Sequence, residues 1–125
     1  PWLDWLAAEH DIHLQTVTGI MPIGQRDAEK FGALIAAYDD WQLGILYRAT
    51  SLSGSLVLGL GFVSKMIDSD AMFGLAFLDE LWQNETWGTD FETANRHGFL
   101  CAELQDAARF LALLADQSLP EKAKI

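Results

Sequence analysis

The sequence is short of cysteine and of basic residues, and each shortage narrows the possible functions. Cys101 is the single cysteine among 125 residues, so neither an intramolecular disulfide nor a cysteine-based metal site can form. Eight Lys and Arg stand against 18 Asp and Glu, for a formal net charge of -10. Nucleic acids and anionic membrane surfaces both require clustered cations, so this chain is a poor candidate to bind either.

Long hydrophobic runs are also absent. The longest nearly apolar stretch, residues 52–63, is too short to cross a bilayer and predicts a buried helix, without membrane insertion. Half of the residues are hydrophobic, which is enough for one folded domain of this length. Because the chain opens on Pro1 and not on Met, we expect an excised domain.

Apolar spacing near 3.6 residues predicts an all-α, single-domain bundle of five or six helices. We expect at most one short extended segment, residues 12–18, where Ile12 and Leu14 alternate with polar residues. The domain should cover residues 1–117, and residues 118–125 should form a frayed tail. The expected helices are residues 1–10, 25–38, about 40–52, 51–64, 70–87 and about 91–117.

The segment 70–88 has apolar residues on two sides of its predicted helix. At about 100° per residue, one side is the expected core stripe: Ala71, Leu75, Leu78 and Trp82. The opposite side mixes aromatic, acidic and amide side chains, with Gln83 at its edge: Phe73, Phe77, Glu80, Asn84 and Trp87. A surface helix needs only one apolar face, so the second side calls for an explanation.

Two interpretations of this second side stay open. In the first, the helix is packed on both sides and neighbouring backbone satisfies Glu80 and Asn84, since an unpaired buried carboxylate would be costly. In the second, the side is a partly exposed groove in which aromatic anchors surround a carboxylate, a composition enriched at protein interfaces.

Acidic residues are concentrated around the same helix. Residues 66–95 contain seven carboxylates and no Lys or Arg. This stretch is either a solvated face that keeps the protein soluble or a rim that attracts a basic partner.

Signals for catalysis and metal binding are weak. His10 and His13 have a spacing seen in some metal sites, but they fall at a predicted helix end without nearby cysteines, so no metal is expected. His97, expected at the surface, could meet Glu80, yet such a pair alone is slight support for acid–base chemistry. The glycines at 54, 59 and 61 match no phosphate-loop spacing and predict close helix packing. We therefore expect no catalytic residues and no cofactor.

One motif resembles a known family. Residues 78–88 read LDELWQNETWG, which is similar to the signature of the ATP synthase assembly chaperones that act on the α subunit of the catalytic head. The matching positions are Leu78, Asp79, Glu80, Gln83, Trp87 and Gly88. Supporting similarities are the stretch SLSGSLVLGL at 51–60 and the segment TGIMP at 18–22.

The resemblance implies the helical C-terminal domain of a two-part chaperone, with a β-rich N-terminal domain preceding Pro1. Such a protein would bind the unassembled α subunit and prevent its aggregation, without hydrolysing ATP itself. We expect a monomer, in the cytoplasm if bacterial and in the mitochondrial matrix if eukaryotic. The important acidic residue of the family carries over to Glu80. The full set of predicted partner-binding residues is Glu80, Asp79, Gln83, Asn84, Trp87, Phe73 and Phe77.

Two other functions are retained as alternatives. The chain could be a small self-association or protein-binding domain of other specificity, with the aromatic residues buried across a dimer. Less favoured is a small-molecule enzyme that uses Glu80 and His97, which would need a closed pocket around the two groups.

Overall fold

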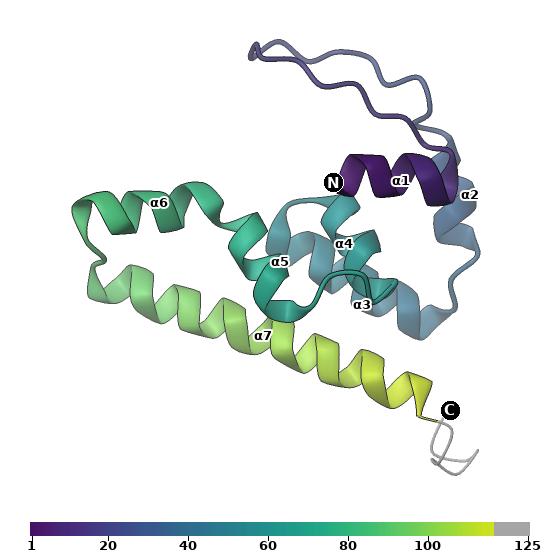
Figure 1. Cartoon of the computed structure of the whole chain (residues 1–125). Helices are drawn as coiled ribbons and strands as arrows, with labels where there is room; N and C mark the ends of the chain where they lie inside the picture. The colour runs from purple at the N-terminus through teal and green to yellow at the C-terminus, as the bar shows by residue number, and fades with distance from the viewer. Residues whose placement is uncertain (117–125) are drawn as a thin grey trace. The chain divides into compact units, whose positions relative to one another are not determined.

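The computed structural model describes residues 1–116 and confirms the all-α class (Figure 1). Within these residues there are seven helices and no strand. The count exceeds five or six because the helix expected over residues 70–87 is divided at Phe77. The helices are α1 (Trp2–His10), α2 (Lys30–Ala36), α3 (Asp40–Ser53), α4 (Leu56–Val63), α5 (Ser69–Ala76), α6 (Leu78–Trp87) and α7 (Phe91–Ala115).

The chain forms two compact units, residues 1–43 and 44–125, which are described separately as the N-terminal and C-terminal units. The boundaries of the expected domain, residues 1–117, stay a prediction. The expected tail, residues 118–125, lies outside the described part of the chain.

The N-terminal unit is organised around a buried carboxylate. Asp27 is 7% exposed and accepts a hydrogen bond of 2.8 Å from the backbone N–H of His13. Lys30 donates to the backbone carbonyl of Asp11 at 2.6 Å and to its carboxylate at 2.9 Å. Because Asp27 is engaged with His13, residues 26–29 form turns, and α2 begins at Lys30 and not near residue 25 as expected.

The segment expected to be extended, residues 12–18, forms no strand. Ile12 is buried, and further along the loop two glutamines tie its two arms together. The backbone N–H of Gln15 donates to the side-chain carbonyl of Gln25 at 2.9 Å, and the Gln25 amide donates back to the Gln15 carbonyl at 3.0 Å. This pair replaces the regular ladder that a strand would need.

In the C-terminal unit, side-chain caps define where the helices begin. Ser55, Asp68 and Asp90 each accept a hydrogen bond from a backbone N–H in the first turn of α4, α5 and α7, which satisfies donors that a helix start leaves unpaired. The helices α4 and α6 contact α5, and α5 packs along α7. The buried apolar residues of this unit are Ile45, Leu46, Ala49, Leu60, Phe62, Val63, Ile67, Met72, Leu104 and Leu111.

Close packing of α3 against α4 depends on Gly59, as predicted for this glycine, whereas Gly54 lies between the two helices at φ 72° and a Cβ atom there would meet nothing within 4 Å. A Cβ atom at position 59 would lie 2.4 Å from the Thr50 hydroxyl oxygen and 3.2 Å from a Leu46 methyl carbon. No side chain larger than hydrogen fits there without moving the Thr50 side chain. Among the described helices, none is both long enough and apolar enough to span a membrane.

Candidate functional site

The residues predicted to bind a partner lie on α5, on α6 and at Phe77 between them. Phe77 separates α5 from α6 because its backbone, at φ -113° and ψ 25°, is not helical. Its ring lies beside the ring of Phe73, with centroids 4.9 Å apart. The break lets α6 leave the line of α5 and run beside α7 (Figure 1).

The expected core stripe of this segment is wrong. Ala71 is exposed, and the exposed fractions of Leu75, Leu78 and Trp82 are 42%, 63% and 58%. The core residue of α5 is instead Met72, which is fully buried. The physical reason is α7, which packs against the opposite side of the segment through contacts of Phe73, Phe77 and Glu80 with His97.

Glu80 is held against α7 by two basic side chains. Its carboxylate forms an ion pair with Arg96 and lies 2.9 Å from His97 Nε2. A carboxylate only accepts hydrogen bonds, so the Nε2–H of His97 donates in this contact. Glu80 therefore has hydrogen-bond partners. They are side chains of α7, whereas the packed interpretation expected neighbouring backbone groups.

His97 is buried, with 9% of its surface exposed, so the expectation of a surface residue is wrong. Phe73 meets the His97 ring edge to face, with centroids 5.4 Å apart, and the Phe77 ring lies at 5.8 Å. Glu80, His97 and the two phenylalanines thus form one cluster that joins α5 and α6 to α7. We call these residues, with Arg96, the Glu80 cluster.

The remaining predicted partner-binding residues differ in how exposed they are. Asn84 is half-buried, whereas Asp79, Gln83 and Trp87 are exposed. Trp87 is 73% exposed, and its ring meets that of Trp82 edge to face at 5.5 Å. Gly88 then ends α6 at φ 86°, a conformation that other residues rarely adopt.

The ionisation of Glu80 favours the folded state at neutral pH. The hydrogen bond from His97 is the main cause that lowers the pKa of Glu80 below its ordinary value of 4.5, and the charge of Arg96 acts in the same direction. A carboxyl whose pKa is lower in the folded than in the unfolded state stabilises the fold above its unfolded pKa. That contribution disappears as the pH falls through the folded value.

We therefore predict that Glu80→Gln flattens the acid limb of the stability curve. Urea unfolding between roughly pH 3 and pH 6 should show a steeper loss of stability on acidification for the wild type than for the variant. Asp11, Asp27 and Asp90 also have lowered pKa values, but they titrate in both proteins, so the difference isolates Glu80. If the free energy of unfolding fell equally with pH in both proteins, Glu80 would not contribute to the acid dependence of stability.

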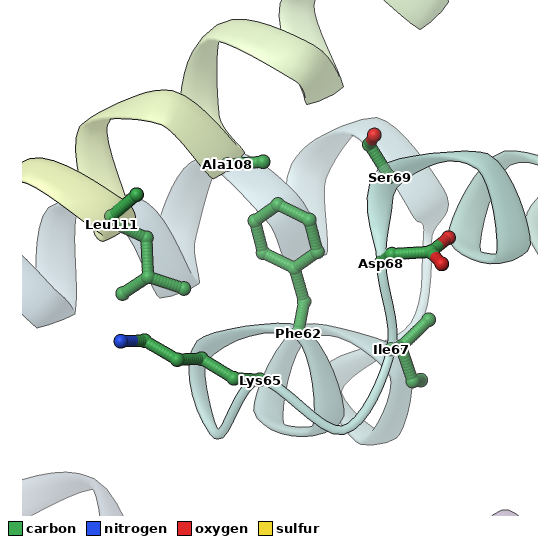
Figure 2. Close-up of a pocket in the computed structure, with 8 residues that line it drawn as sticks. Phe62, Lys65, Ile67, Asp68, Ser69, Ala108 and Leu111 are labelled. Atoms are coloured by element: carbon green, nitrogen blue, oxygen red, sulfur yellow. The ribbon is translucent and has the colours of Figure 1, made fainter.

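In the described part of the C-terminal unit, residues 44–116, two surface hollows are well formed, and neither is lined by Glu80 or His97. The first lies between the end of α4, the start of α5 and α7, where the Phe62 ring points toward Ala108 and Leu111 (Figure 2). Asp68, at its edge, is already engaged as the cap of α5. The structure thus brings together the two groups of the enzyme alternative without placing them in either hollow.

The other residues singled out in the sequence have local partners. The ring of His10 packs against Trp5 with centroids 5.2 Å apart, and His13 pairs with Asp27 at 3.3 Å. No group of three or more potential ligands within residues 1–116 could hold a metal ion. Cys101 is half-buried, and burial raises the pKa of its thiol.

Solved structures similar to this chain agree with the resemblance in the sequence. Atp12 from Paracoccus denitrificans matches with a TM-score of 0.83 and 33% identity, over 90% of this chain and 49% of that one. An aspartate-to-lysine mutant of the same protein matches at 0.83 and 32%, over 90% and 49%. Atu1473 from Agrobacterium tumefaciens, provisionally assigned as a chaperone, matches at 0.79 and 29%, over 93% and 44%.

These matches confirm the resemblance to the ATP synthase assembly chaperones, since the chain has an Atp12-like fold over nine tenths of its length. It spans about half the length of the structures that it matches. No family model and no curated protein matches it.

Proposed function

We propose, starting from the Atp12-like fold, that this chain is the helical C-terminal part of an assembly chaperone for the ATP synthase. Its client would be the unassembled α subunit of the catalytic head, which it would keep from aggregating before assembly. The observation that carries the proposal is the match in fold and sequence to Atp12 at 33% identity. The proposal includes a β-rich N-terminal domain in the whole chaperone, a monomeric state and a bacterial cytoplasmic location.

The geometry of α6 supports two different roles among the predicted partner-binding residues. Asp79, Gln83 and Trp87 are exposed and are available to contact a client. Glu80, half-buried and paired with Arg96 and His97, would act by holding α6 in place. Phe73, Phe77 and Asn84, which are also half-buried, would support it in the same way.

Binding to purified α subunit tests the proposal. The chain should form a complex with free α subunit in size-exclusion chromatography and should reduce light scattering when the α subunit is diluted from denaturant. Trp87→Gln should weaken the complex by about tenfold or more, as expected for an exposed aromatic at an interface. Tyr47→Gln, on α3 and 75% exposed, is the matched control. Absence of any complex with the wild type would overturn the proposal.

A further inference from the structure

An apolar patch lies on the outer side of α5 and α6, away from the Glu80 cluster. We call it the Trp82 face; it consists of Leu75, Leu78, Trp82 and Trp87. These side chains are between 42% and 73% exposed, and the contact between the two tryptophan rings makes the patch continuous at its C-terminal end.

The size of the Trp82 face is unusual for a surface without a partner. The two tryptophans alone expose on the order of 250 Å² of largely apolar surface, given about 200 Å² for each side chain. With the two leucines, the patch reaches the range of about 300–600 Å² that is typical of the largest and often functional patch on a monomer.

The charged residues beside the Trp82 face on α6 are acidic. Leu78, Trp82 and Glu85 follow helical spacing along one side of α6, and Asp79 lies in its first turn. Neither Asp79 nor Glu85 forms an ion pair within the described part of the chain. Residues 66–95 as a whole contain seven carboxylates and no basic residue.

We propose that the Trp82 face docks a polypeptide segment of the client that presents apolar side chains flanked by Lys or Arg. This inference rests on the proposed chaperone function and adds to it the chemistry of the recognised segment. The apolar centre would supply affinity, and the unpaired carboxylates would select basic flanks and speed association. A second copy fits poorly, because it would place acidic rim against acidic rim in a chain of net charge -10.

A peptide pair gives a direct test on the full 125-residue chain. The probe is a synthetic amphipathic peptide of leucine and lysine, and its counterpart replaces every lysine with glutamate. Binding is followed by the fluorescence of the protein's own tryptophans and by calorimetry. The lysine peptide should bind with an affinity that falls as salt rises, and the glutamate peptide should bind at least about tenfold more weakly.

Three variants locate the site. Leu78→Gln and Trp82→Gln keep a good helix former and remove apolar surface, and each should weaken the lysine peptide by about tenfold. Glu85→Lys should weaken it without removing any apolar contact. Tyr47→Gln, exposed on α3, should leave binding unchanged, and circular dichroism checks that all four variants keep their helices.

The outcomes separate this inference from the proposed function. If wild type and Trp82→Gln bind both the lysine peptide and the α subunit equally, the inference is wrong and the chaperone function stands. If the variants lose the peptide but the wild type never binds α subunit, the docking surface stands and the proposed client is wrong. If the wild type forms a dimer in sedimentation that Trp82→Gln abolishes, the occupant is a second copy and the inference is overturned.

Discussion

Replacing Gly59 with alanine should lower the free energy of unfolding by about 1–3 kcal/mol, the usual cost of overpacking a well-filled core. The added Cβ would lie 2.4 Å from the Thr50 hydroxyl oxygen and 3.4 Å from the Thr50 backbone nitrogen. The hydroxyl can be displaced only by rotating a β-branched side chain, whose χ1 is restricted in a helix. Urea unfolding monitored by circular dichroism measures the loss.

Gly98→Ala is the matched control, since Gly98 lies inside α7 and a Cβ atom there would meet nothing within 4 Å. Helix propensity alone should then act, and the control should gain up to about 1 kcal/mol. A gain for Gly59→Ala as well would contradict the close approach of α3 and α4.

Thr50 provides a second check on the same contact. Its hydroxyl is buried and has no hydrogen-bond partner in the described part of the chain. Thr50→Ala removes this oxygen, so Gly59→Ala should cost less in the Thr50→Ala background than in the wild type. Equal costs in the two backgrounds would show that the hydroxyl is not the atom that resists the new methyl group.

Helix boundaries in this chain were predictable where short polar side chains cap them. Asp39 accepts a hydrogen bond from the Gln42 backbone N–H, Asp90 does the same for Thr93, and Gly88 ends α6; Asp and Gly are the residue types that ordinarily occupy these positions. The helix expected from residue 70 begins at Ser69, and Asp68 is its cap. Neighbouring acidic and hydroxyl residues are equally good caps, so local chemistry could not choose among them.

The break at Phe77 and the burial of His97 were not predictable from local pattern. Both involve contacts between α5 or α6 and α7, where Arg96 and His97 lie 16 and 17 residues after Glu80 and the rings of Phe73 and Phe77 pack against His97. Helical spacing across residues 70–88 separated two sides but did not show which of them α7 would cover, and the core was assigned to the side that is exposed. The pairing of Glu80 with His97 was the one part of this cluster that the sequence had suggested.

Glu80→Lys should weaken the complex with the α subunit by more than tenfold while the total helix content stays unchanged. An ammonium group would face Arg96 and the His97 ring, where a carboxylate now pairs with both. The repulsion should release α6 from α7 and misplace Asp79, Gln83 and Trp87, which the proposed function assigns to the client. Hydrogen exchange should become faster along α6, and chromatography with purified α subunit measures the loss of binding.

A charge exchange distinguishes positioning from direct contact. Arg96→Glu combined with Glu80→Lys restores an ion pair between α6 and α7 but leaves a positive charge at position 80. If Glu80 acts by positioning α6, the double variant should recover protection of α6 and a large part of α-subunit binding. Recovered protection without recovered binding would instead mean that the Glu80 carboxylate, 38% exposed, contacts the client itself. A single variant Arg96→Glu that binds as the wild type does would contradict positioning through the Arg96 ion pair, because Glu80 would then be left with His97 as its partner without consequence.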